Sequence, residues 1–237
     1  MTERTKGLET RQRILEEACK VFGEKGFRDA THADICSRAG ANVAAINYYF
    51  GTKENLYRAV FEHLSERSEV LYPFGEGLSE DAAPEVRLYA FIHAFLGRVF
   101  DQEELMQLHH IRMAEMFAST GLLDDLMERH LASVAVHISG ILQLLLGPGA
   151  SARDLEWCGM CVVGQCLIGA YGPQDDKHRH MLNFSAADLD SLAEHIHRFS
   201  LAGIEAIRQR SNAHAEKGHL PLESTRTELE TDDEQSQ

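Results

Sequence analysis

One stretch, from residue 31 to residue 57, limits what this chain can fold into: THADICSRAGANVAAINYYFGTKENLY. Thr31 precedes a short amphipathic segment, where a helix N-cap belongs, and Gly40 follows that segment, where a helix can end without steric strain. Asn42 then precedes a second short segment, which ends at Gly51. A helix, a turn that contains glycine and a second short helix make a helix-turn-helix. The stretch therefore predicts a unit that reads DNA.

The second of these helices, Val43 to Tyr49, contains no charged residue. Ile46 and Phe50 are four residues apart, so they form one buried stripe. Small side chains on the other face would let the helix lie deep in a DNA groove, and Asn47 could pair with an adenine edge. The alternative is a tightly packed internal helix of an ordinary bundle, but the two capped glycine turns have helix-turn-helix spacing. We expect base contacts from Asn42, Val43, Ala44, Ala45 and Asn47, and phosphate contacts from Thr31, His32, Tyr48, Tyr49 and Lys53.

The formal net charge of -14 is unusual for a nucleic-acid binder, so its distribution along the chain matters. Residues 1–67 carry 11 Lys/Arg and 10 Asp/Glu, whereas the other 170 residues carry 12 and 27. The acidic charge is therefore segregated from the predicted DNA-reading unit. Phosphate contacts would depend on a local basic set, of which each member could alternatively be a solvated surface charge: Arg4, Lys6, Arg11, Arg28, Arg38 and Lys53.

Helical periodicity continues through the rest of the chain without strand alternation, so we expect an all-α protein. The N-terminal head, residues 1–57, should contain three helices, be folded from about residue 9 and continue as a helix to about residue 71. Pro73 and its neighbouring glycines break that helix. Residues 84–210 should form a second, larger helical domain. Residues 211–237 are acidic and poor in apolar side chains, which predicts a disordered tail.

Two parts of the sequence resemble a known family. Ile35-x-x-x-Ala39-Gly40 and the following Ile46-Asn47-Tyr48-Tyr49-Phe50-Gly51-Thr52-Lys53-Glu54-x-Leu56 resemble the DNA-binding signature of the TetR/AcrR transcriptional regulators. The start of the second helix, Asn42-Val43-Ala44-Ala45, departs from the Ser-x-Gly-Thr that is common in the family and is similar to the CecR-like subgroup. The segments 163–167 and 198–203 resemble the C-terminal region of that subgroup.

The resemblance implies that residues 84–210 bind an effector and dimerise. The last two helices would pack against their copies in a homodimer as a four-helix bundle. Two heads about 34–36 Å apart would read a palindromic double-stranded operator. A small, mostly apolar molecule in the C-terminal cavity would move the heads out of register, so the protein is expected to act as a ligand-released repressor.

Candidate effector contacts combine aromatic rings with a few polar or sulfur-containing side chains, as small-molecule cavities do. His109 and His110 are adjacent on a predicted helix and point about 100° apart, so both cannot enter one pocket. The alternative is that one is a satisfied core histidine and the other faces solvent. The candidates are Phe91, Phe95, His109, Met113, Met116, Phe117 and Gln165.

The cysteines leave a second interpretation open. Cys158 and Cys161 match C-x-x-C and, with Cys166, could serve a cytosolic thiol or metal sensor, for which His178 and His180 are the candidate additional ligands. However, the C-x-x-C lies inside a predicted helix and the two histidines lack zinc-finger spacing. We therefore expect the cysteines to be small buried side chains and expect no bound metal.

Enzyme motifs are absent from the sequence: it contains no nucleophile elbow, P-loop, H-E-x-x-H or dinucleotide glycine fingerprint. We therefore expect no enzymatic activity and no cofactor. The chain opens without an apolar secretion segment, and its five cysteines are typical of a reducing compartment, so a cytoplasmic location is expected. The uncharged run 157–174 is interpreted as a buried or interface helix, so no membrane association is expected.

Overall fold

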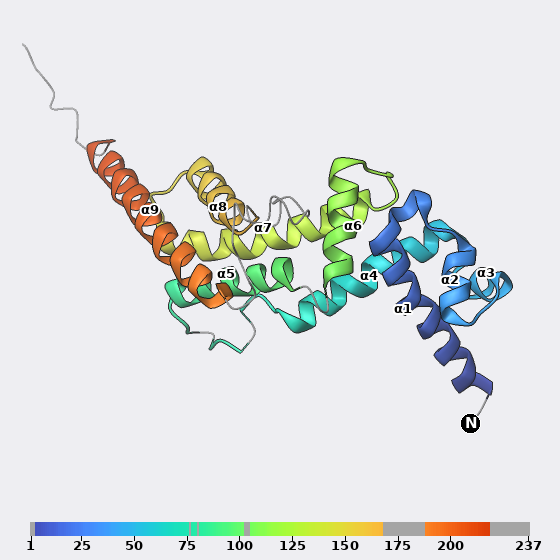
Figure 1. The fold of residues 1–237 in the computed structure, drawn as a ribbon. Coiled ribbons are helices and arrows are strands. Elements are labelled where there is room, and N and C mark those ends of the chain that lie inside the picture. The colour runs from blue at the N-terminus through green and yellow to red at the C-terminus, as the bar shows by residue number, and fades with distance from the viewer. Residues whose placement is uncertain (1–2, 76, 80, 102–104, 168–187, 219–237) are drawn as a thin grey trace, which may run out of the picture.

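The computed structural model describes residues 3–75, 77–79, 81–101, 105–167 and 188–218. Within these ranges the chain folds into nine helices and contains no strand, which confirms the predicted all-α fold. The molecule is elongated, with α3 near one end and α9 at the other (Figure 1). The helices are α1 (Glu3–Asp29), α2 (His32–Ala39), α3 (Val43–Phe50), α4 (Lys53–Leu71), α5 (Pro84–Phe100), α6 (Met106–Phe117), α7 (Asp124–Leu146), α8 (Ala152–Leu167) and α9 (Leu189–Gly218).

Helices α2 and α3 form the helix-turn-helix, and short-range capping explains where they begin and end. Thr31, Asn42 and Thr52 each accept a hydrogen bond from a backbone N–H in the first turn of α2, α3 and α4. Gly40 ends α2 with φ 57, a left-handed conformation that a residue with a Cβ rarely adopts. These local interactions place α3 across α2 in the predicted arrangement.

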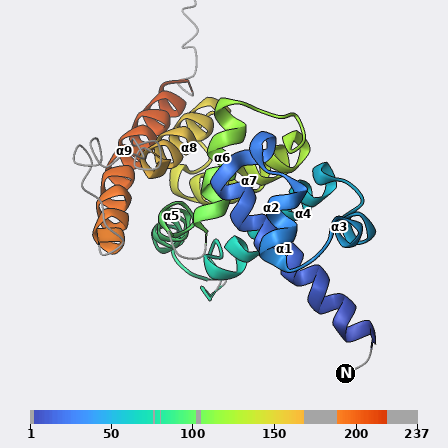
Figure 2. The same ribbon diagram turned by 45° about the vertical axis from the view of Figure 1, so that its right-hand side comes forward.

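Helix α1 supports this unit and is longer than the sequence predicted. It begins at Glu3, whereas we expected an ordered chain only from about residue 9. Gly26, with φ 72, interrupts its helical geometry near the end, and Phe27 then packs against the head's core. The first turns of α1 project beyond the other helices in both ribbon views (Figure 2).

Helix α6 packs with the head, although the sequence assigned it to the second domain. Its Leu108 and Ile111 are buried in the same hydrophobic cluster as the inner faces of α1 to α4. The backbone of α1 lies close to α6 because Gly23 has no side chain. A Cβ at Gly23 would lie 3.1 Å from Cα of Gln107 on α6. The head's core therefore contains a helix from beyond residue 84.

The remaining helices, α5, α7, α8 and α9, surround a second hydrophobic cluster. Helix α9 continues to Gly218, so the predicted tail from residue 211 begins as a helix. Residues 219–237 lie outside the described ranges. The second cluster contains Leu88, Phe91, Ile92, Phe95, Leu96, Val134, Ile138, Leu142, Leu146, Cys158, Val162, Cys166, Ala193, Ile196 and Ile204.

Among the described residues, α7 is the one helix whose length and composition would suffice to cross a membrane. Its Val134, Ile138, Leu142 and Leu146 are buried against other helices of the second cluster. This packing accounts for one apolar face of α7, while Leu131, Val136 and Leu144 on the same helix are exposed.

Candidate nucleic-acid interface and ligand pocket

Helix α3 buries one stripe and exposes the opposite face. Ile46 and Phe50 pack into the head's core, as their four-residue spacing predicted. On the other side, Tyr48 is 81% exposed, and Val43 is exposed as well. Of the five residues predicted to contact bases, Asn42, Val43, Ala44 and Asn47 are exposed, whereas Ala45 is half-buried against the core.

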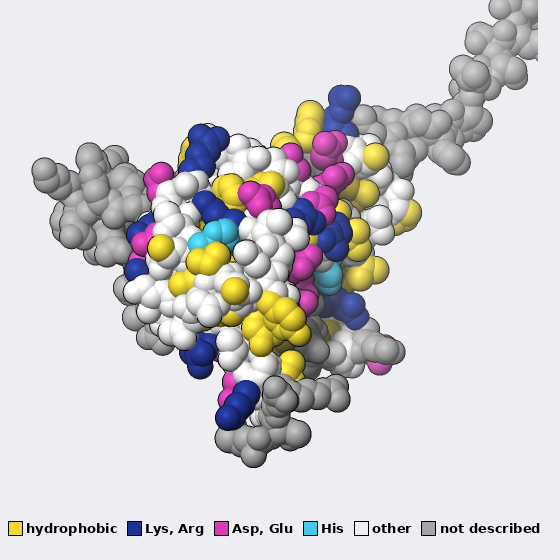
Figure 3. All heavy atoms as spheres, turned by 90° about the vertical axis from the view of Figure 1, so that its right-hand side faces the viewer, with side chains coloured by type: hydrophobic (Ala, Val, Ile, Leu, Met, Phe, Trp, Pro, Cys, Tyr) yellow, Lys and Arg dark blue, Asp and Glu magenta, His cyan; other side chains and the backbone are white. Residues whose placement is uncertain are grey.

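The face of the molecule that includes α3 is mostly uncharged. Seen from the head's end, its centre consists largely of hydrophobic and other uncharged atoms, with Lys, Arg, Asp and Glu side chains scattered around them (Figure 3). A short helix with a neutral outer face can lie close to the edges of base pairs without the cost of desolvating a charge.

Several residues predicted to hold phosphate already make bonds within the head. The hydroxyl of Thr31 donates to Oδ2 of Asp34 (2.7 Å) while accepting from the Asp34 N–H (3.1 Å). Lys53 Nζ donates to the Ala30 carbonyl (2.6 Å) and lies 4.5 Å from the centroid of the Phe27 ring. Both side chains therefore hold helix junctions together, which the sequence motif did not indicate.

The other predicted phosphate contacts differ in their surroundings. Tyr48 is exposed, whereas Tyr49 is half-buried. The Tyr49 hydroxyl packs against α1 at Gly7, where an added Cβ would lie 3.3 Å from the hydroxyl oxygen. His32 is half-buried, and its Nε2 is buried without a hydrogen-bond partner among the described residues.

The basic set around the head is smaller than its sequence suggests. Arg38 forms a two-bonded ion pair with Glu24, at 2.8 and 2.6 Å. Arg11 places its guanidinium 4.9 Å from the centroid of the Phe50 ring. Lys6 and Arg28 are exposed to solvent, as a contact with DNA phosphate requires.

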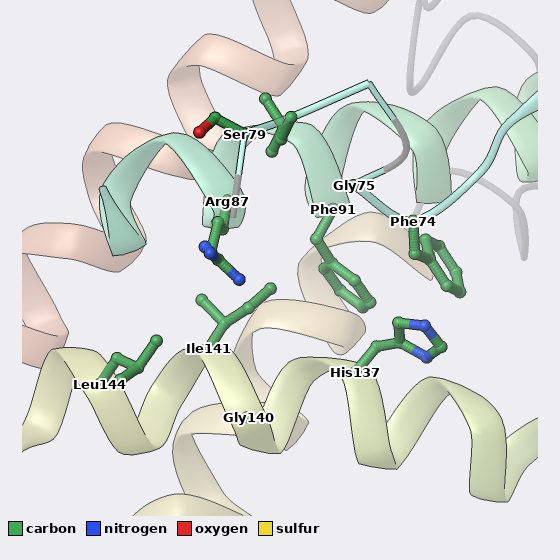
Figure 4. A pocket seen from close by; sticks show the side chains of 10 residues that line it. Phe74, Gly75, Ser79, Arg87, Phe91, His137, Gly140, Ile141 and Leu144 are labelled. Atoms are coloured by element: carbon green, nitrogen blue, oxygen red, sulfur yellow. The ribbon is translucent and has the colours of Figure 1, made fainter. Parts of the chain in front are cut away.

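A pocket of about 380 Å³ lies between α5, α7 and the segment that joins α4 to α5. Phe74, Phe91 and His137 gather at one end of it, while Arg87 points toward Ile141 and Leu144 at the other (Figure 4). Its wall is completed by Gly75, Leu78, Ser79 and Gly140.

The structure places one of the predicted effector contacts, Phe91, in the wall of this pocket. Phe95 lies next to it in the core, 5.9 Å between ring centroids. The remaining candidates are not brought together with these two rings. Gln165 donates to the Cys161 carbonyl (3.0 Å) and the Ser200 hydroxyl (3.3 Å), between α8 and α9.

The four candidates on α6 belong to the head side of the molecule. Met116 is 50% and Phe117 78% exposed, while His109 and Met113 are half-buried. Their spacing suggested a helix that faces a cavity, but α6 turns its apolar side toward α1 and α4. Of the ten residues that line the pocket, sequence reasoning named only Phe91. Those it missed include Phe74, which stands in a segment that reads as a linker, and His137, which carries no motif.

Cys158 and Cys166 are buried, as expected, whereas the expectation was wrong for Cys161, which is exposed. Burial raises the pKa of the Cys166 thiol to about 12 and also raises that of Cys158. A raised pKa disfavours the reactive thiolate. Cys161 is exposed, and the described residues contain no group of three or more His, Cys, Asp or Glu side chains that could hold a metal ion. His178 and His180 lie outside the described residues.

Two family models match the chain. Residues 84–204 match the C-terminal domain of the HTH-type transcriptional dual regulator CecR, and this match alone spans just over half of the sequence. Residues 14–60 match the bacterial regulatory proteins of the tetR family. The second match contains α2 and α3 and most of α1.

Curated relatives are similar over part of their length. CecR of Shigella flexneri is 36% identical over 85 residues, which are 36% of this chain and 35% of that protein. The probable HTH-type transcriptional regulator YttP of Bacillus subtilis (strain 168) is 30% identical over 152 residues, 61% of this chain and 67% of that protein. The chain thus matches about a third of CecR and two thirds of YttP.

Solved structures have a similar fold. A putative transcriptional regulator from Pseudomonas aeruginosa PAO1 superimposes with a TM-score of 0.64 and 18% identity, covering 84% of this chain and 92% of that one. The regulator FadR from Bacillus subtilis, in complex with stearoyl-CoA, superimposes with a TM-score of 0.60 and 19% identity, covering 81% and 98%. At these identities the similarity concerns the fold.

Proposed function

The chain belongs to the TetR family of bacterial transcriptional regulators and has a CecR-type C-terminal domain, and on that premise we propose that it is a homodimeric repressor. It binds a palindromic operator through α3 and leaves it when a small, mostly apolar molecule occupies the second domain. The observation that carries this proposal is α3 itself, whose inner stripe is buried and whose neutral outer face is exposed at one end of the molecule.

In this proposal the exposed residues of α3 read the bases. Val43 and Ala44 contact apolar groups in the major groove, and Asn47 accepts from and donates to an adenine edge. Asn42 keeps its side-chain NH₂ available, because only its Oδ1 is used in the α3 cap (2.9 Å to the Ala45 N–H). Tyr48 reaches the phosphates, and Thr31 and Lys53 present phosphate contacts from helix junctions that they also stabilise.

Dimerisation would use α8 and α9, as the family resemblance implies. Large apolar side chains stand exposed on both helices: Trp157 and Met160 on α8 and Phe199 on α9. An isolated subunit has no reason to expose so much apolar surface on neighbouring helices, so a second copy is a suitable cover. Sedimentation at micromolar protein concentration checks this, since a monomer there would contradict it.

Ligand binding would reach the head through α4. This helix begins beside α3 and ends at Leu71, three residues before Phe74 in the pocket wall. A second connection joins α4 to the start of α7, where Arg58 donates two hydrogen bonds to Asp125 (2.6 and 2.7 Å). A ligand that favours one position of α4 therefore also favours one spacing of the two heads.

The test of base reading is Asn47→Ala in the full-length dimer, with operator fragments first selected from genomic DNA. We expect the variant to lose discrimination at one base pair in each half-site, by about 1–3 kcal/mol, while the dependence of affinity on salt is preserved. Asn212→Ala, an exposed helical asparagine at the far end of α9, is the matched control. Unchanged sequence preference in the Asn47 variant would remove this residue from the readout.

A further inference from the structure

Three cationic or imidazole side chains meet in the interior, between the head and the second domain. Arg98 comes from α5, Arg112 from α6 and His130 from α7. Arg98 is only 7% exposed. A guanidinium N–H of Arg112 donates to Nδ1 of His130, with Nη2 and Nδ1 3.4 Å apart. Arg98 is buried and Arg112 is half-buried, which is unusual because arginine is almost never buried unless it is paired.

Their bonds leave much of the hydrogen-bonding capacity unused. Arg98 donates through Nε to the Tyr72 carbonyl (2.8 Å), and its guanidinium lies 3.7 Å from the centroid of the Phe74 ring. Arg112 lies 5.9 Å from the centroid of the Phe61 ring, and its Nε is buried without a partner.

Within the described ranges, no carboxylate lies within 4.0 Å of either guanidinium. Glu69, on the exposed side of α4, acts on both only through its more distant charge. Burial lowers the pKa of Arg98 and of Arg112 to about 10, so both stay charged at neutral pH. Burial, and then the two arginine charges, lower the pKa of His130 to about 3, so this imidazole is neutral there. The site is therefore strongly positive, and no carboxylate from the described ranges serves it as a counter-ion.

The cationic site adjoins the apolar pocket. Phe74 forms the boundary, since its ring stacks on the Arg98 guanidinium and also lines the pocket. The rings of Phe91 and His137 lie 4.8 and 5.4 Å from that of Phe74, on the pocket side. His137 and His130 are seven residues apart, two helical turns, so they lie on the same face of α7. A molecule that fills the pocket can thus carry a polar group to the arginines.

We infer that the effector is an amphiphile with a single oxyanion head: its apolar body occupies the Phe74–Phe91 pocket, and its carboxylate or phosphate is held by Arg98 and Arg112. Guanidinium groups bind such oxyanions through paired, charge-assisted hydrogen bonds. The orphan donor Arg112 Nε would gain an acceptor. This inference rests on the proposed function only in calling the molecule an effector; the binding site itself does not depend on DNA.

The probes are decanoate, decyl phosphate and decan-1-ol, which share one chain and differ in the head. Calorimetric titration of the full-length protein should give a Kd for decanoate or decyl phosphate at least tenfold below that for decanol; the tighter of the two anions identifies the head group. Arg112→Met, which keeps the apolar stem, should remove that preference and leave decanol binding unchanged. Arg129→Met, an exposed neighbour of His130 on α7, is the matched control and should behave as wild type.

Stability without ligand gives a second reading. Because Arg112 is a half-buried charge that no carboxylate of the described residues pairs with, Arg112→Met should raise the melting temperature of the ligand-free protein. Equal affinity for decanoate and decanol, no binding of either anion, or an Arg112→Met protein that is less stable and still prefers the anion would each overturn the inference. If the anion binds at the arginines but does not release the operator, the site stands and the proposed induction fails. If the protein binds the operator but neither anion, the proposed DNA binding stands and the inferred anion site fails.

Discussion

Tyr57 offers a sharp test of how α6 is held against the other helices of the head. Its hydroxyl, on α4, donates to Oε1 of Glu115 on α6 (2.9 Å), and both side chains are buried. Burial, and then the charge of Glu115, raise the pKa of Tyr57, so the hydroxyl stays protonated and keeps donating. Glu115 also accepts from the N–H and hydroxyl of Thr120 (both 2.9 Å). The carboxylate is thus held by one donor from the head and two from the α6–α7 connection.

Replacing Tyr57 with Phe removes only the donor from α4. The ring keeps its contacts with Phe22 and Phe27, at 4.9 and 5.0 Å between centroids. A hydrogen bond to a charged, buried group contributes about 1.5–3 kcal/mol, and Thr120 continues to satisfy Glu115 in part. We therefore expect a loss of about 2 kcal/mol in the free energy of unfolding.

Urea unfolding at one fixed protein concentration measures this loss as a lower midpoint with an unchanged slope. Tyr48→Phe is the matched control, because it deletes an exposed hydroxyl and should change stability by less than about 0.5 kcal/mol. If the two variants lose equally little, the Tyr57–Glu115 bond does not hold α4 to α6, and the reasoning about a buried, charge-assisted contact is refuted.

Two further predictions concern the surface of the head. Lys53→Ala removes the donor to the Ala30 carbonyl and one cation, so we expect the free energy of unfolding to fall by about 1 kcal/mol. DNA binding should weaken equally for all sequences, and the slope of log affinity against log salt concentration should become shallower by about one. An unchanged slope would contradict the phosphate contact. Hydrogen bonds from Arg58 lower the pKa of Asp125 to about 2, so their pair stabilises the fold above the unfolded pKa of about 4 and is lost as pH falls toward 2. Wild type should therefore lose more stability than Asp125→Asn over that range in acid melting curves, and identical pH profiles would contradict it.

The sequence predicted the helix-turn-helix well because its signals are local. Thr31, Asn42 and Gly40 act within one or two turns of themselves, and Ile46 and Phe50 mark a buried stripe by spacing alone. The separation of the acidic charge from the head could also be predicted, because it follows from counting charged residues along the sequence. Which basic residues remain unpaired could not, because Arg38 meets Glu24 only after α1 and α2 pack together.

The pocket depends on contacts that no local pattern encodes. Phe74 stands in a Pro/Gly-containing segment that reads as a linker, and it becomes part of a wall only when α5 and α7 pack beside it. On α6, the apolar spacing correctly indicated a buried face but not its partner, which is the head rather than a cavity. Tertiary packing decides which helices face each other. The sequence therefore could not show that the predicted effector contacts on α6 lie away from Phe91.

The position of α6 bears on how such regulators can be recombined. A chimera that joins residues 1–83 of this chain to the C-terminal domain of another regulator would lack Leu108 and Ile111, which are part of the head's hydrophobic core. Unless the donor of the other half supplies a helix of matching shape against Gly23, the grafted reader would expose its core and aggregate. The natural unit of exchange is therefore discontinuous: the first four helices together with a later piece, residues 105–126, that supplies Leu105, Leu108, Ile111, Leu123 and Leu126 to the same core.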